Sequence, residues 1–261
     1  VVCLQAASAT ALVAKKTLHN YPAPAAILSC VFGGTLLPIE KGLEVEAKHF
    51  ARLVTGPVAR NLIRTMFVNK GNADKLSVRP ADVPKSKVTK LGVLGAGMMG
   101  AGVAYVSAMA GMEVILIDST TGQAEKGKAY SAKLLAKDVE KGRRTQEQAE
   151  AVLARIKPTV DYAQLEGADL VIEAVFEHRG IKADVTAKAE AVMPKTSVFA
   201  SNTSTLPITG LAKASKRPKN FIGIHFFSPV DKMPLVEIIV GKQTGDEAIA
   251  RALDYVGQLR K

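Results

Sequence analysis

The hydrophobic positions follow two different patterns along the chain. Up to about residue 70, apolar side chains recur at helical spacing, as at Leu43, Ala47, Phe50 and Val54. From residue 88 onward, short apolar runs alternate with longer amphipathic stretches, which predicts a parallel sheet with helices on both faces. We therefore predict an α/β fold, a doubly wound and mostly parallel sheet, preceded by an α-helical segment.

The same pattern divides the chain into three parts. Residues 1–70 are expected to be helical, with helices over Ala6–Leu18, Pro24–Val31, Leu36–Leu53 and Pro57–Val68. Gly33 and Gly34 are expected to end the second of these helices. Residues 71–87 are polar, contain Pro80 and Pro84, and are expected to form a linker. Residues 88–261 form the predicted α/β domain.

In that domain the apolar runs predict seven strands and a final helix. The last helix is expected over Asp246–Lys261. The predicted strands are Val88–Leu94, Glu113–Ile117, Ile156–Val160, Leu170–Ala174, Ser197–Ala200, Phe221–Ile224 and Val236–Val240.

A glycine turn follows the first predicted strand and opens a helix-compatible stretch. It reads Gly95-Ala96-Gly97-Met98-Met99-Gly100. Gly95 allows a tight turn, Gly97 lets a pyrophosphate approach the backbone, and Gly100 lets the helix pack close to the sheet. The helix start then offers free N–H groups and a positive dipole to phosphates. Strand, turn and helix together predict a Rossmann-type dinucleotide site.

An acidic residue completes the pattern. Asp118 ends the second predicted strand, where a carboxylate accepts hydrogen bonds from the adenosine ribose hydroxyls. Ser119, Thr120 and Thr121 follow it, without an arginine to bind the 2′-phosphate of NADP. We therefore predict NAD as the cofactor. The alternative at this point is a doubly wound domain that binds another nucleotide, or none.

Three later residues suggest chemistry at the carboxyl edge of the sheet. Ser204 follows one predicted strand, His225 ends the next, and Glu237 lies within the apolar strand after that. A histidine oriented by a carboxylate is a suitable base for an alcohol proton, and a nearby serine hydroxyl can hold the substrate oxygen. The alternative is a packed histidine and a charge at a strand edge. The other histidines, His19, His49 and His178, have no comparable setting.

Composition narrows the class of protein. The chain has 261 residues, 48% of them hydrophobic and 23% charged, as in ordinary globular proteins. No apolar run is long enough to span a membrane. Its two cysteines, Cys3 and Cys30, are not spaced for zinc or for a disulfide framework, and we expect a cytoplasmic location. The first residues do not resemble a signal peptide, and we expect them to lie inside a longer protein.

The net charge of +11 is concentrated near the start. Residues 1–87 carry 12 Lys and Arg against 5 Asp and Glu. Such a surface attracts acidic partners, such as the phosphates of coenzyme A, but it is also typical of solvated helices. Aromatic and basic residues do not alternate as they do in nucleic-acid binders, so we expect no nucleic-acid partner.

The motifs resemble those of the L-3-hydroxyacyl-CoA dehydrogenase family. The similar stretches are VLGAGMMGAGVAYVSAMAG, VILID, LVIEAVFE, FASNTSTL and GIHFFSPVDKMPLVEII, in the family's order and spacing from about Val88 to the end. The resemblance implies oxidation of L-3-hydroxyacyl-CoA by NAD, with His225 as base, Glu237 as its acidic partner and Ser204 near the substrate oxygen and nicotinamide. It also implies cofactor contacts at Met98, Met99, Asp118, Val175, Phe176, Glu177, Lys182 and Ser204.

The chain also departs from this family. Ser228 stands where many relatives have Asn, and we expect altered contacts to the nicotinamide there. Residues 1–70 resemble the helical tail of a crotonase-like hydratase domain, as in the multifunctional α-subunit of bacterial fatty acid β-oxidation. We expect the hydratase core and the C-terminal helical dehydrogenase domain to lie outside the chain.

The resemblance leaves three alternatives open. The chain alone is either a dehydrogenase or an NAD-binding module with little turnover. A parent that is a short-chain 3-hydroxybutyryl-CoA dehydrogenase is a further alternative. A thiolase subunit and self-association are the implied partners of a multifunctional parent.

Overall fold

The chain forms two compact units in a computed structural model that describes the backbone from residue 2 and the side chains from residue 8 to 261. One unit extends to Val78, and the other comprises Arg79–Lys261. The division falls within residues 71–87, for which the sequence predicted a linker.

The first unit is helical. No helix in the described part of the chain has both the length and the apolar composition that spanning a membrane requires. The elements are α1 (Val2–Thr17), α2 (Pro22–Gly34), α3 (Ile39–Val54), α4 (Pro57–Ile63), a π-helical stretch η1 (Arg64–Asn69) and α5 (Lys70–Asp74).

One helix boundary in this unit differs slightly from the prediction. The second helix ends at the glycine pair as expected, but α2 includes both glycines and ends at Gly34 instead of Val31. A Cβ on Gly42 of α3 would lie 3.6 Å from the Cα of Gly34. This is an ordinary van der Waals distance, so α2 and α3 are in contact at Gly34 and Gly42. The last predicted helix also extends further, because α4, η1 and α5 follow one another without a break.

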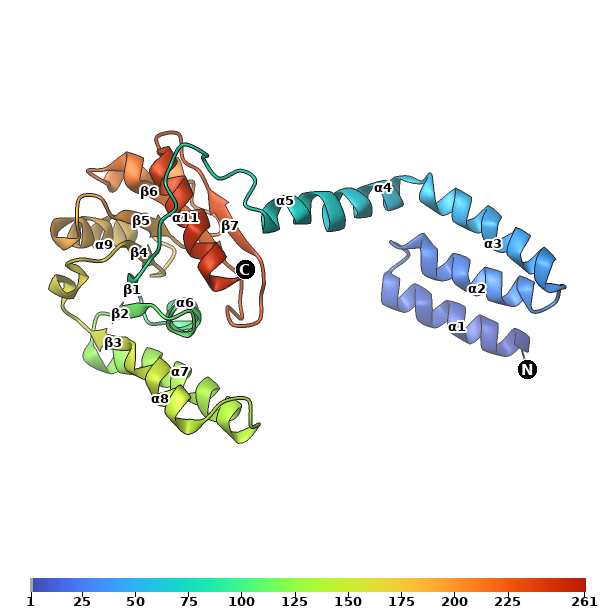
Figure 1. Ribbon diagram of the computed structural model, residues 1–261, viewed down its shortest axis with the longest axis horizontal. Helices are drawn as coiled ribbons and strands as arrows, with labels where there is room; N and C mark the ends of the chain where they lie inside the picture. Colours follow the sequence, from blue (N-terminus) through green and yellow to red (C-terminus); the bar gives the residue numbers. More distant parts are fainter. Residues whose placement is uncertain (1) are drawn as a thin grey trace. The chain divides into compact units, whose positions relative to one another are not determined.

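The second unit is built on a seven-stranded sheet of order β3-β2-β1-β4-β5-β6-β7 (Figure 1). Each strand lies where the sequence predicted one, with small shifts at the ends. Neighbouring strands run parallel except for β7, which is antiparallel to β6. The strands are β1 (Lys90–Leu94), β2 (Glu113–Ile117), β3 (Ile156–Thr159), β4 (Leu170–Glu173), β5 (Val198–Ser201), β6 (Phe221–Phe226) and β7 (Val236–Ile239).

Helices bury both faces of this sheet, as expected for a doubly wound fold. On β2, Val114 and Leu116 join the core beneath α6, α7, α8 and α11, whereas Ile115 and Ile117 join the core beneath α9 and α10. This alternation explains why the strand is apolar at every position after its first. The helices are α6 (Met98–Met109), α7 (Thr121–Glu140), α8 (Gln146–Ala154), α9 (Arg179–Val192), α10 (Ile208–Leu211) and α11 (Asp246–Leu259).

The topology brings the loops after β1, β4, β5 and β6 to one edge of the sheet, because parallel strands end on the same side. Ligands of doubly wound proteins bind outside this carboxyl edge. The antiparallel β7 returns along β6, and its register sets Glu237 opposite His225. The fold therefore gathers the predicted site residues along one edge.

Within the second unit, an ion pair attaches the segment before β1 to α11. Arg79 donates to both carboxylate oxygens of Asp254 on α11, at 2.7 and 2.9 Å. The backbone N–H and the hydroxyl of Ser86 donate to the same carboxylate, at 2.8 and 2.9 Å. Burial alone would raise the pKa of Asp254, but these hydrogen bonds outweigh it and hold the pKa below its usual value.

We predict that Asp254→Asn lowers the free energy of unfolding at pH 7, because Arg79 then loses its buried counter-charge. A carboxylate whose pKa is lowered in the folded state stabilises it above the unfolded pKa, which is about 4. That contribution is lost as the pH falls through the folded value. Denaturant unfolding should therefore show the gap between variant and wild type closing below about pH 4.

Asp184→Asn is the matched control. Its carboxylate is 59% exposed and pairs with Lys188 on the surface of α9. If Asp254→Asn lost the same stability at every pH, or no more stability than Asp184→Asn, the stabilising role given to the Asp254 carboxylate would be contradicted.

Candidate active site

The glycine turn after β1 is shaped by two close backbone approaches. Gly95 has a φ of +92°, and a Cβ there would lie 2.7 Å from the carbonyl oxygen of Ala174. A Cβ on Gly100 would lie 1.8 Å from the carbonyl oxygen of Gly95. Both positions therefore require glycine, and together they let α6 begin directly at the end of the strand.

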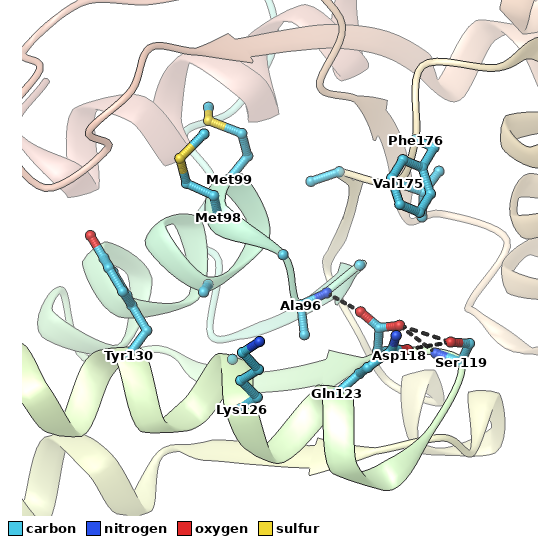
Figure 2. A pocket seen from close by; sticks show the side chains of 15 residues that line it. Ala96, Met98, Met99, Asp118, Ser119, Gln123, Lys126, Tyr130, Val175 and Phe176 are labelled. Atoms are coloured by element: carbon cyan, nitrogen blue, oxygen red, sulfur yellow. Dashed lines mark hydrogen bonds between the residues drawn. The ribbon is translucent and has the colours of Figure 1, made fainter.

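Gly97 differs from these two, because a Cβ built on it meets nothing within 4 Å. It opens onto a cavity of about 730 Å³ whose lining includes the predicted residues Gly95, Gly97, Met98, Met99, Asp118, Val175 and Phe176 (Figure 2). The polar lining also includes Ser119, which directly follows Asp118, and three residues of α7 that were not predicted as contacts, which are Gln123, Lys126 and Tyr130. Their helical spacing of three to four residues was the available signal.

Asp118 holds the glycine turn as well as facing the cavity. One of its carboxylate oxygens accepts the backbone N–H of Ala96 at 2.6 Å. The other accepts the backbone N–H and the hydroxyl of Ser119, at 2.6 and 3.1 Å. Figure 2 shows these bonds beside the turn. The acid predicted to bind ribose is thus already positioned by backbone donors.

These features fit a dinucleotide. The α6 helix starts at Met98 with no side chain capping it, so its first N–H groups face the cavity. The open space at Gly97 admits a phosphate, Lys126 supplies a positive charge on the lining, and Asp118 supplies the ribose acceptor. Val175 and Phe176 lie across the cavity from Met99 (Figure 2), and Phe176 is 82% exposed.

His225 and Glu237 form the predicted pair. The register of β6 and β7 sets them opposite each other, and Nδ1 of His225 lies 2.8 Å from Oε2 of Glu237. The histidine ring also packs against Phe227, with centroids 4.5 Å apart. With Glu237 ionised, Nδ1 carries the proton, which leaves Nε2 as an acceptor. His225 therefore has a carboxylate partner in the structure.

The loop after β5 carries Ser204 and supports β6. Ser204 is exposed. Two residues earlier, Oδ1 of Asn202 accepts the backbone N–H of Phe226 at 2.9 Å, directly after His225. Asn202 lies within the motif FASNTSTL, but the sequence alone did not indicate a role for it. Its amide ties the serine loop to the strand end that carries the histidine.

Glu177 and Lys182 belong to a polar cluster in which Lys182 is buried and Glu177 is exposed. Lys182 is 2% exposed, and its ammonium lies 2.8 Å from Glu173 and 3.1 Å from Glu177. Ser201 donates its hydroxyl to Glu173, and Thr203 donates to Glu177. Burial raises the pKa of Glu173, although Lys182 and Ser201 act in the opposite direction. Burial also acts to raise the pKa of Glu177, but bonds from Thr203 and Lys182 outweigh it and lower that pKa.

Sequence reasoning missed Glu173. It is an acid within the apolar run Leu170–Ala174, so the argument that singled out Glu237 applies to it equally.

The predicted residues fall into three groups along the edge. The cavity brings together the glycine turn, Asp118, Val175 and Phe176. Ser228 joins this group through Met98, whose sulfur lies 3.7 Å from the Ser228 hydroxyl. His225 and Glu237 form a second group, and Glu177 and Lys182 a third. Ser204, His225 and Glu237 do not line the cavity, and the side chain of Glu237 is 51% exposed.

The chain is similar in sequence to known proteins. The family model for the 3-hydroxyacyl-CoA dehydrogenase NAD-binding domain matches residues 90–261. Over 254 residues the chain is 40% identical to a fatty acid oxidation complex subunit alpha of Pseudomonas paraeruginosa, covering 97% of this chain and 35% of that protein. A protein of the same name from Psychrobacter arcticus is 38% identical over 248 residues, covering 95% and 34%. The chain spans about a third of the length of these curated relatives.

Solved structures resemble the second unit. The (S)-3-hydroxybutyryl-CoA dehydrogenase of Ralstonia eutropha is 36% identical with a TM-score of 0.65, covering 67% of this chain and 62% of that one. The 3-hydroxybutyryl-CoA dehydrogenase of Escherichia coli is 34% identical with a TM-score of 0.65, covering 67% and 37%. The family model and these structures support NAD as the cofactor of the second unit. The chain belongs to the 3-hydroxyacyl-CoA dehydrogenase family, with the NAD-binding domain of that family over residues 90–261.

Proposed function

We propose that this chain carries the cofactor and proton-transfer half of an active site that oxidises L-3-hydroxyacyl-CoA to 3-ketoacyl-CoA. The observation that carries the proposal is the 2.8 Å contact between His225 and Glu237 on the same sheet edge as the glycine turn. NAD, when bound, supplies the acceptor for the hydride that leaves C3. The chain's own residues then have to bind and orient the substrate and the cofactor, and to remove the proton of the substrate hydroxyl.

His225 is the proposed base. Its Nε2 accepts the proton of the substrate hydroxyl, and the ring becomes an imidazolium ion. Glu237, held at Nδ1, keeps the ring oriented and stabilises that positive charge. Ser204 is proposed to hold the substrate oxygen from the loop after β5. Asn202 supports this arrangement, because it bonds to the backbone directly after His225.

The proposed cofactor contacts are Gly95, Gly97, Met98, Met99, Gly100, Asp118, Val175, Phe176, Glu177, Lys182, Ser204 and Ser228. Much of the rate enhancement is then positional, because the turn and Asp118 hold the dinucleotide in a fixed place relative to His225.

A second candidate function is NAD binding with little turnover. It is favoured by the open substrate side of the site, where Glu237 is 51% exposed and Phe176 is 82% exposed. A proton-transfer site open to water gains less from its electrostatic interactions.

We also propose that the whole protein combines this dehydrogenase with a crotonase-like hydratase. In support, the two fatty acid oxidation relatives cover 95–97% of the chain, the helical unit included, whereas the two 3-hydroxybutyryl-CoA dehydrogenases cover 67%. A thiolase subunit, self-association and a cytoplasmic location belong to the same proposal. The extent of the native gene on both sides of the chain tests it, and a gene without hydratase residues would contradict it.

The two candidate functions separate in a pair of assays on the 261-residue chain. NAD binding is measured by calorimetry, and NADH formation from L-3-hydroxybutyryl-CoA by absorbance. The dehydrogenase proposal predicts both binding and turnover. NAD binding without NADH formation supports the second candidate, an NAD-binding module with little turnover. Failure to bind NAD contradicts both candidate functions.

We predict that His225→Gln lowers kcat by about 10² to 10⁴-fold, because glutamine cannot accept the hydroxyl proton. NAD affinity should stay nearly unchanged, since His225 does not line the cavity. The measurement is steady-state kinetics of the full-length protein beside calorimetry. His49→Gln, in the helical unit, is the control, and an unchanged kcat in His225→Gln would remove the residue from this role.

We predict that Gly97→Ala weakens NAD binding by about tenfold, or about 1.4 kcal/mol. The added methyl group meets no protein atom within 4 Å, so the fold accepts it, but it occupies the space proposed for the pyrophosphate. Gly122→Ala is the matched control, because Gly122 has equally open surroundings at a helix start outside the cavity lining. Calorimetry that gives both variants the wild-type affinity would contradict the placement of the pyrophosphate.

A further inference from the structure

The imidazole ring of His225 has an aromatic neighbour as well as a carboxylate. Its Nδ1 lies 2.8 Å from Oε2 of Glu237. The ring of Phe227 is the second neighbour, with the two centroids 4.5 Å apart and the ring planes tilted by 51°. This separation is at the short end of the range, about 4.5–7 Å, in which aromatic rings attract each other. Phe227 therefore contacts the proposed base directly.

The backbone explains why this phenylalanine reaches the histidine. Phe227 directly follows β6, and residues two apart on an extended chain point to the same face of a sheet. Phe226, between them, points to the opposite face, where its ring meets Tyr255 of α11 edge-on with centroids 6.4 Å apart. The two adjacent phenylalanines therefore have different surroundings, which are the apolar core for Phe226 and the histidine for Phe227.

Glu237 alone is a weak partner for a charged histidine. Its side chain is 51% exposed, whereas that of His225 is 16% exposed. Water screens an exposed carboxylate, so its attraction for the charged ring is small. A single contact at Nδ1 also does not fix the plane of the ring. A second contact, made with the ring itself, supplies what the carboxylate lacks.

The proposed reaction turns His225 into a cation, and aromatic rings attract cations. When Nε2 takes the substrate proton, the neutral imidazole becomes an imidazolium ion. A cation within about 6 Å of an aromatic centroid is attracted by the negative face of the ring, more strongly where water is excluded. Because this charge develops during the reaction, the attraction favours the transition state over the bound substrate, and it acts on kcat.

We propose that Phe227 is a positioning residue for His225, which holds the plane of the imidazole ring and stabilises the imidazolium ion that forms during proton transfer. The proposal rests on the function proposed above and deepens it. Glu237 holds Nδ1, and Phe227 holds the ring. Phe227 acts through His225 and needs no contact with the substrate or the cofactor.

The first test compares two variants of the full-length protein by steady-state kinetics. Phe227→Leu keeps an apolar side chain but removes the aromatic ring, and it should lower kcat by about tenfold. The KM for L-3-hydroxyacyl-CoA and the affinity for NADH should stay unchanged, because the ring acts only on the charged histidine. Phe227→Tyr keeps an aromatic face and should retain the wild-type kcat.

Phe221→Leu is the matched control. Phe221 begins the same strand, is buried, and stacks on Phe199 with centroids 5.5 Å apart. Its replacement should lower the melting temperature and leave kcat at the wild-type value, when the assay is run below the melting transition. If Phe227→Leu also changed only the melting temperature, the proposal would be overturned.

The second test separates charge stabilisation from packing. Singly, doubly and triply fluorinated phenylalanine at position 227 withdraws negative charge from the ring face at nearly constant size, so kcat should fall with each added fluorine. The same kcat throughout this series would overturn the proposal and leave the proposed function intact. A wild-type protein without turnover contradicts the proposed function, and the role of Phe227 with it.

Discussion

The site depends on the contact between the start of α6 and the end of β1. The helix can begin there only because no side chain separates Gly100 from the carbonyl oxygen of Gly95, where a Cβ would come within 1.8 Å. That contact directs the first N–H groups of α6 outward at the carboxyl edge. Asp118 then holds the turn through Ala96 at 2.6 Å. The proposed cofactor site is therefore a consequence of backbone packing, and side chains refine it.

A polar layer extends from this turn along the edge of the sheet. The ends of β4, β5 and β6 carry Glu173, Ser201 and His225. Ser201 donates its hydroxyl to Glu173, and Asn202 accepts the backbone N–H of Phe226, the residue after His225. Groups that lie near the solvent side, such as Glu237 and Phe176, are exposed. Groups beneath them, such as Glu173 and Lys182, are buried and paired. Exposed residues at this edge suit contact with ligands.

The sequence was sufficient for the strands, because a sheet buried on both faces produces apolar runs that stand out between amphipathic helices. It was also sufficient for the pairing of His225 with Glu237, since an acid in an apolar strand requires a partner. It was less accurate for the exact end of the second helix, which continues to Gly34 instead of stopping at Val31, because glycine weakens a helix without fixing its last residue. The cluster around Lys182 depends on contacts between separate loops, which periodicity along the chain does not encode.

The central claim is that NAD binds at the carboxyl edge, between the glycine turn and the loop after β4. Hydrogen exchange with and without saturating NADH tests this claim most directly, because it reports the location of binding. The account predicts slower exchange in peptides that cover residues 95–101 and 174–177, and unchanged exchange in residues 8–78. Protection that is absent from the glycine turn, or confined to the helical unit, would contradict it.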